Sequence, residues 1–167
     1  MLSAETSAGR YPVEAARMMS RIACEAEESL RWSLLTGFKP STSAEPPAQA
    51  EIIAGAACRI ANVANAAAIV VFTATGASAR LIARYRPPVP VYAFTSNAAA
   101  ARQLSVIFGL RAVVREEHAS TDEMMELMNR TLVEDKLVRP GDAVVFVAGQ
   151  PIGIPGTTNM VKLHRIG

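Results

Sequence analysis

The stretch AAIVVFTATGAS, residues 67–78, decides the fold class. Residues 67–73 form an almost wholly apolar run, which is typical of a strand buried on both faces of a sheet. The run ends in a short loop of Thr, Gly and Ser, and a helix is expected to begin at Ser78. A buried strand followed at once by a helix is the repeating unit of parallel α/β sheets.

The same alternation continues on the C-terminal side of this stretch. The expected helices are residues 78–85, 98–108 and 120–136, and the expected strands are residues 90–95, 112–115 and 143–148. Residues 159–166 alternate polar and apolar side chains and follow a loop without a helix, which is typical of an antiparallel edge strand. The sequence therefore predicts a three-layer α/β/α domain with a mainly parallel five-stranded sheet.

Two further helices are expected before the sheet. Residues 11–34 carry one apolar stripe at helical spacing, and residues 48–64 form an Ala-rich helix. Between them, residues 38–47 are rich in Pro and Ser and are interpreted as a linker. The expected organisation is an N-terminal segment (1–37), the linker and an α/β domain (48–167).

Composition and charge exclude several classes of function. Half of the residues are hydrophobic, 19% are charged, and the formal net charge is +2. No basic run exceeds two residues and aromatic residues are few, which argues against nucleic-acid binding. The N-terminus lacks the pattern of a signal peptide, and the longest apolar run (64–73) is too short to span a bilayer. A cytoplasmic protein that binds neither nucleic acid nor a membrane is expected.

Two loops could carry chemistry. The first follows the strand quoted above and consists of Thr73, Ala74, Thr75, Gly76, Ala77 and Ser78. Its hydroxyls and the N-terminus of the next helix could cradle a phosphate, or the loop could be a plain turn with a Ser or Thr cap. It lacks the Lys of a P-loop and the three spaced glycines of a dinucleotide fold.

The second loop spans residues 149–159 and begins where the fourth strand ends. Its candidate residues are Gly149, Gly156, Thr157, Thr158 and Asn159. Because parallel strands end at the same edge of a sheet, both loops are expected on one rim, where ligands bind in open α/β sheets. The alternative is an ordered connection whose Thr and Asn side chains satisfy their own backbone.

Other candidates are weak. Neither His118 nor His164 has a partner at ligand spacing, so no metal site is expected. Cys24 and Cys58 fall in expected helices and are expected to be buried, reduced thiols. A further group consists of Arg80, Arg84 and Arg86. These arginines could be a solvated helix face, neighbours of a phosphate, or a subunit contact.

Four segments together resemble the pyruvate kinase family. They are residues 1–15 (MLSAET, Gly9, Tyr11-Pro12, Glu14-Ala15), 73–87, 90–95, and the closing loop with its strand (Gly149, Gly156-Thr157-Thr158-Asn159, Val161-Lys162-Leu163-His164). Each motif alone is weak, but their order and spacing agree over the full length of the chain. The resemblance is to the C-terminal portion of the enzyme: the last strand and helix of its (β/α)₈ barrel (1–37), the linker and the C-terminal α/β domain.

The resemblance implies a parent enzyme that transfers a phosphoryl group from phosphoenolpyruvate to ADP, giving pyruvate and ATP in the final step of glycolysis. The family uses Mg²⁺ and often K⁺, and its catalytic residues converge on a barrel that this chain lacks. Only Ser3, Glu5 and Thr6 match residues at the rim of that site. The chain alone is therefore expected to bind no cofactor and to have no kinase activity. It is either a fragment of the enzyme or a free-standing effector-binding or assembly module.

The family's C-terminal domain binds a phosphorylated effector and contributes to a homotetramer. By resemblance, the first loop would hold a phosphate and the loop from Gly149 to Asn159 would close over the ligand. Many members that bind fructose 1,6-bisphosphate have Lys where this chain has Ala74, and Trp and Arg where it has residues 150–152. A sugar phosphate and AMP are the candidate effectors, and a vestigial site is the remaining alternative.

Overall fold

The computed structural model describes residues 2–36, 48–116 and 120–167, with side chains omitted for residues 28–36. The chain separates into two units, residues 1–38 and 39–167, which are described in turn. The linker predicted at residues 38–47 lies outside the described residues, as does His118.

The first unit consists of the helices α1 (Ala4–Ser7) and α2 (Pro12–Thr36). Residues 4–7 form a helical turn whose backbone bonds are local, such as Ala8 N–H to the carbonyl of Ala4 at 2.9 Å, and the interpretation of residues 1–37 as a barrel strand and helix stays a prediction. A strand needs a neighbouring strand to pair its backbone groups. No strand occurs among the described residues of this unit.

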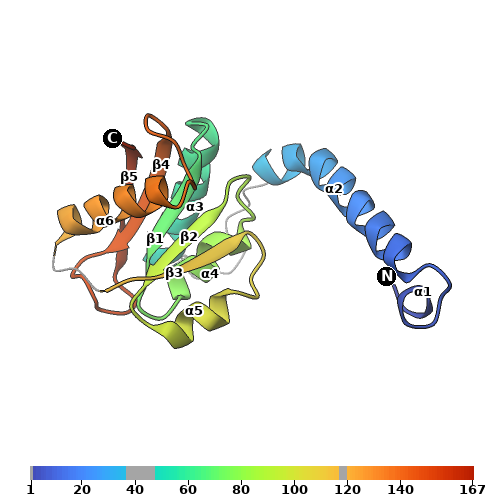
Figure 1. Cartoon of the computed structure of the whole chain (residues 1–167). Coiled ribbons are helices and arrows are strands. Elements are labelled where there is room, and N and C mark those ends of the chain that lie inside the picture. Colours follow the sequence, from blue (N-terminus) through green and yellow to red (C-terminus); the bar gives the residue numbers. More distant parts are fainter. Residues whose placement is uncertain (1, 37–47, 117–119) are drawn as a thin grey trace. The chain divides into compact units, whose positions relative to one another are not determined.

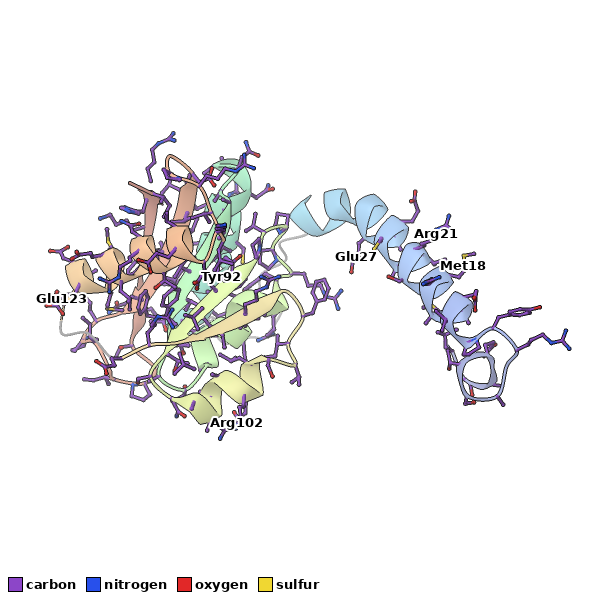
Figure 2. All side chains as sticks on the ribbon, in the orientation of Figure 1. Met18, Arg21, Glu27, Tyr92, Arg102 and Glu123 are labelled. Atoms are coloured by element: carbon purple, nitrogen blue, oxygen red, sulfur yellow. The ribbon has the colours of Figure 1, made fainter. Side chains whose placement is uncertain are left out.

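Several apolar side chains of helix α2 are exposed. Val13, Met18 and Ile22 are each more than half exposed. Met18, Arg21 and Glu27 project from α2 without covering neighbours (Figure 2). Cys24 is likewise exposed, so its expected burial is wrong, since no second layer packs on this helix in its own unit. Cys58 of the second unit is half-buried, and burial raises its pKa to about 12.

The second unit is built on a five-stranded sheet in the order β3-β2-β1-β4-β5 (Figure 1). The strands are β1 (Ala68–Phe72), β2 (Val91–Thr95), β3 (Leu110–Val114), β4 (Ala143–Gly149) and β5 (Thr158–Arg165). Strands β1 to β4 pair in parallel, whereas β5 pairs antiparallel with β4 and forms one edge. The predicted mainly parallel sheet with an antiparallel last strand is confirmed.

Four helices cover the two faces of this sheet. They are α3 (Gln49–Val63), α4 (Ala77–Arg84), α5 (Ala98–Leu104) and α6 (Thr121–Glu134). Alternate strand residues point to opposite faces. Ile69, Val71 and Val145 therefore pack with α3, α4 and α5, whereas Val70, Phe94 and Phe146 pack with α6. The predicted three-layer α/β/α architecture is confirmed (Figure 1).

Helix boundaries follow local capping groups. The side chain of Asn97 accepts from the amides of Ala99 and Ala100 and begins α5, and Ser120 accepts from the amide of Glu123 and begins α6. Helix α5 ends at Leu104, four residues earlier than the sequence predicts. Figure 2 shows Tyr92 among the interior side chains, whereas Arg102 stands on the outer side of α5.

One histidine joins the edge strand to α6. The Nε2 atom of His164 lies 3.0 Å from Oδ1 of Asn129, and burial, followed by the charge of Lys162, lowers the pKa of His164. A lowered pKa favours the neutral ring in the folded state. Its contribution to stability is thus present above the unfolded-state pKa of about 6.5 and is lost as the pH falls from there toward the folded-state pKa.

We therefore expect the free energy of unfolding to decrease as the pH is lowered from about 7.5 to about 5, and to decrease less in His164→Gln. Urea unfolding of both proteins at several pH values measures the difference. An equal decrease in the two proteins would contradict the assignment to His164.

Candidate functional site

A cavity opens at the carboxyl ends of the parallel strands. It encloses about 110 Å³, several times the roughly 10–15 Å³ that one water molecule requires, so it can hold a group of several heavy atoms. Residues of both candidate loops line it, together with the ends of β1, β2 and β3. The parallel order of the strands creates this rim, because every strand from β1 to β4 ends on the same side of the sheet.

The first loop leads from β1 into the N-terminus of α4. Thr73, Thr75 and Ser78 line the cavity, as do Ala74 and Ala77. Gly76 does not line it: its backbone has a φ of 82°, and a Cβ atom there would lie 3.1 Å from Cδ2 of Leu104. Gly76 therefore makes the left-handed turn and the close packing against α5, rather than presenting itself to the cavity.

The hydroxyls of the lining are arranged as hydrogen-bond donors. Oγ1 of Thr73 accepts from the Gly76 amide at 3.0 Å, and Oγ1 of Thr75 accepts from the Ala77 amide at 3.4 Å. At the end of β2, the buried Thr95 accepts from the Asn97 amide at 3.1 Å. Since a hydroxyl has one proton and two lone pairs, each of these groups keeps its O–H as a donor. Such a lining suits an anion.

One hydrogen bond joins the two loops. Oγ of Ser78, in the first turn of α4, lies 2.5 Å from Oγ1 of Thr158, the first residue of β5. Only one of the two hydroxyl protons can lie between these oxygens, so the other is left to donate elsewhere. Both residues line the cavity, and Thr158 is only 7% exposed.

Other residues of the second loop hold the loop itself. Oγ1 of Thr157 donates to the carbonyls of Pro151 and Ile154. The Asn159 side chain accepts from the Gln150 amide at 3.0 Å and donates to the Gln150 carbonyl at 2.7 Å, closing the neck of the loop. The polar groups of Thr157 and Asn159 are thus hydrogen-bonded within the loop itself.

The glycines of this loop allow it to fold back. A Cβ atom at Gly149 would lie 2.5 Å from Oγ1 and 2.9 Å from the carbonyl oxygen of Thr157, so only glycine permits this approach. Gly156 has a φ of 85°, a left-handed value that favours glycine. Both glycines line the cavity through backbone atoms.

Sequence reasoning missed several lining residues. Thr95 ends β2 and Ser96 follows it, and Arg115 and Glu116 follow β3. The signal was present, because the rule that ligands sit beyond the carboxyl ends of parallel strands applies to β2 and β3 as well as to β1. An apolar wall was also missed, formed by Phe72, Phe94, Met124 and Ile152.

The three arginines after the first loop do not act together. Arg80 donates to the Thr75 carbonyl at 3.2 Å and to Gln103 at 2.8 Å, so it supports the first loop from outside the cavity. Arg84 lies 4.0 Å from Glu51, and the guanidinium of Arg86 lies over the ring of Phe108 at 5.3 Å. Arg80 and Arg84 lie one turn apart on α4 and bond different partners, and Arg86 lies beyond the end of this helix.

The residues matched to the barrel rim lie in the first unit. The Ser3 amide donates to the Glu5 carboxylate at 3.0 Å, and the Thr6 hydroxyl donates to the Ser3 carbonyl at 3.1 Å. Backbone N–H groups, those of Glu5 and Ser3, hold the pKa of Glu5 below its ordinary value. These contacts are local to α1, as are those of Ser7, whose hydroxyl also donates to the Ser3 carbonyl at 3.0 Å.

The described parts of the chain contain neither a cluster of metal ligands nor a membrane-spanning helix. Within these parts, no group of three or more His, Cys, Asp or Glu side chains is placed to hold a metal ion. Nor does any helix there have the length and apolar character needed to cross a membrane.

Comparisons with known proteins agree on one family. Residues 51–164 match the family model described as "Pyruvate kinase, alpha/beta domain". The pyruvate kinase of Bacillus licheniformis is 39% identical over 169 residues, covering 100% of this chain and 28% of the relative. That of Mycobacterium tuberculosis (strain H37Rv) is 39% identical over 167 residues, covering 100% of this chain and 34% of the relative.

Solved structures give the same result. A crystal structure of pyruvate kinase from Cryptosporidium parvum matches with a TM-score of 0.79 and 30% identity, covering 100% of this chain and 33% of that one. The chain thus spans about a third of the length of these relatives, and the similarity extends over both of its units.

Proposed function

The chain belongs to the pyruvate kinase family, and from that membership we propose that it is the allosteric and oligomerisation region of such an enzyme, its C-terminal portion. Its cavity binds a phosphorylated metabolite, a sugar phosphate or AMP. The observation that carries this proposal is the donor-rich lining at the N-terminus of α4, where Ser78 meets Thr158. A helix N-terminus and free hydroxyl donors both favour a bound anion.

In our proposal, this chain does not contain the site at which the parent enzyme's reaction takes place. The enzyme transfers a phosphoryl group from phosphoenolpyruvate to ADP, with Mg²⁺ and often K⁺. The described residues offer no cluster of metal ligands, so they do not fit a Mg²⁺ site, and we derive no catalytic step through one. Ser3, Glu5 and Thr6 would at most support a site completed by other residues. The chain alone is thus proposed to be catalytically inactive.

Self-association is the second part of the proposal. Strand β5 is an edge strand of eight residues, and the outer backbone groups of an edge can pair with another chain. Leu163 on β5 is half exposed, and Ile52 and Val63 on the neighbouring α3 are 54% and 73% exposed. Apolar exposure beside an open edge favours assembly with a second copy, within a homotetramer in the parent enzyme.

A free-standing binding module is the second candidate. It is favoured by the core of the α/β unit, which fills both faces of the sheet without help from the first unit. The two candidates share the phosphate site and differ in whether a barrel accompanies it.

Thermal unfolding in the presence of phosphate compounds tests the function. We expect inorganic phosphate, fructose 6-phosphate or AMP to raise Tm in a concentration-dependent way, with about 2.7 kcal/mol of stabilisation at a hundred times the Kd. Chloride at equal ionic strength is the control. A Tm unmoved by all three compounds, or pyruvate formed from phosphoenolpyruvate and ADP by this chain alone, would contradict the proposal.

A further inference from the structure

We propose that Arg80 supplies positive charge to the phosphate site from outside the cavity, through a chain of hydrogen bonds that ends at the Thr73 hydroxyl. The inference rests on the phosphate-binding function proposed above and identifies a residue that sets the strength of binding without touching the ligand. Three observations carry it: the first loop has no cation of its own, Arg80 is bonded to this loop, and Arg80 has no carboxylate partner among the described residues.

The first loop is a candidate anion site without a cation. Residues 73–78 contain no Lys or Arg. Among the described residues that line the cavity, Arg115 is the one cation, and its guanidinium lies 4.0 Å from the Asp135 carboxylate. Glu116, the next residue, also lines the cavity. A phosphate ester with a charge of about −1.5 to −2 at pH 7 would therefore gain from a cation placed behind the loop.

Arg80 begins a continuous chain of hydrogen bonds. Its Nη1 atom donates to the Thr75 carbonyl at 3.2 Å. That carbonyl belongs to the same peptide group as the Gly76 N–H, which donates to Oγ1 of Thr73 at 3.0 Å. The Thr73 hydroxyl keeps its own proton, and Thr73 lines the cavity whereas Arg80 does not. The chain thus leads from a guanidinium outside the cavity to a donor inside it.

Each bond of this chain polarises the next. A guanidinium that donates to a carbonyl draws electrons toward the carbonyl oxygen, so the N–H of the same peptide group becomes a stronger donor. The Gly76 N–H in turn makes the Thr73 hydroxyl a stronger donor toward an anion. Hydrogen bonds with an ionised partner are also roughly twice as strong as neutral ones. Gly76 is buried, which limits the access of water to the middle bond of the chain.

The charge of Arg80 is not neutralised by a carboxylate. Residues 52–115 contain no Asp or Glu, and among the described residues Arg80 forms no salt bridge. Its second contact is neutral: Nη2 donates to Oε1 of Gln103 on α5 at 2.8 Å and fixes the plane of the guanidinium. Arg84, one turn further along α4, lies 4.0 Å from Glu51 instead. Arg80 can therefore add positive potential to the loop, and Arg84 provides a matched comparison.

Calorimetric titration of the chain with fructose 6-phosphate tests this role. Arg80→Met removes the charge and keeps most of the length of the side chain, and it should weaken binding about tenfold. Arg80→Lys keeps a charged donor for the Thr75 carbonyl and should restore most of the affinity. Arg84→Met makes the same change where the arginine is paired with Glu51, and it should leave the affinity unchanged.

A double-mutant cycle tests whether Arg80 acts through Thr73. Thr73→Val removes the hydroxyl at the end of the chain. After this change, Arg80→Met should cost less than about threefold in affinity, because the route to the ligand is already broken. Urea unfolding of each variant shows whether the fold is retained.

The outcomes separate this inference from the function on which it rests. Unchanged affinity in Arg80→Met, or equal weakening in Arg80→Met and Arg80→Lys, overturns the electrostatic role and leaves the phosphate site standing. Full and independent losses in the double variant overturn the route through Thr73. Absence of binding by the unmodified chain overturns both the inference and the proposed function.

Discussion

Replacing Ser78 by aspartate should weaken the binding of phosphate esters by at least about 100-fold, because like charges brought together in a binding site cost several kcal/mol. Ser78 lies in the first turn of α4 and lines the cavity. A carboxylate there would occupy the end of the cavity that the ligand's phosphate is proposed to fill. The same negative charge suits a helix N-terminus, so the fold should be kept.

Position 78 suits this test better than position 76. A side chain at Gly76 would meet Leu104 and would have to adopt a left-handed backbone, so a loss of binding could reflect a damaged fold. Calorimetry of Ser78→Asp measures the loss of phosphate binding, and thermal unfolding of the same variant measures any loss of stability. Ala99→Asp, which adds an acid to the first turn of α5 outside the lining, is the matched control. Unchanged phosphate affinity in Ser78→Asp would contradict the site.

Replacing Phe146 by alanine should lower the free energy of unfolding by about 3–5 kcal/mol, the usual cost of removing a fully buried Phe ring. Phe146 is 0% exposed on β4, packs in the core beneath α6, and lies 5.5 Å from the ring of Phe72. Because Phe72 lines the cavity, the change should also weaken ligand binding.

Urea unfolding with an unchanged m-value measures this loss. Phe108→Ala is the control, because Phe108 is 63% exposed and contacts only the guanidinium of Arg86 as a ring partner among the described residues. Its loss should stay below about 1 kcal/mol. Comparable losses in the two variants would contradict the assignment of Phe146 to the core.

The sheet could be predicted from the sequence because its signal is local. Short apolar runs such as residues 67–73, separated by helices, require a sheet covered on both faces. The alternating pattern of residues 159–166 likewise marked β5 as an edge strand. The barrel strand expected at the N-terminus is different, because a strand depends on hydrogen-bonding neighbours, and the described residues of this unit include no other strand to pair with it.

The position of the two candidate loops was predictable, and the direction of their side chains was less so. The rule for parallel sheets placed both loops on one rim, and the structure brings Ser78 and Thr158 into contact there. The sequence could not distinguish Gly76, whose role is the turn, from hydroxyls that line the cavity. Nor could it separate Thr158 from Thr157, because the direction of a loop side chain is set by its local backbone bonds.

Arg115 lines the cavity although it lies far from the first loop in sequence. It comes from the end of β3, and only the sheet order places it on the rim shared with the first loop. Of the three arginines that follow that loop in sequence, Arg80 bonds the loop from outside the cavity, whereas Arg84 and Arg86 contact Glu51 and Phe108. Proximity along the chain was thus a poor guide to the charges of the cavity.

A crystal structure of this chain grown with fructose 6-phosphate tests the phosphate site most directly. We expect the phosphorus atom to lie at the N-terminus of α4, with phosphate oxygens within about 3 Å of the hydroxyls of Ser78 and Thr158. Density for the phosphate elsewhere on the protein, or an unchanged Ser78–Thr158 pair with no ligand at saturating concentration, would contradict the account.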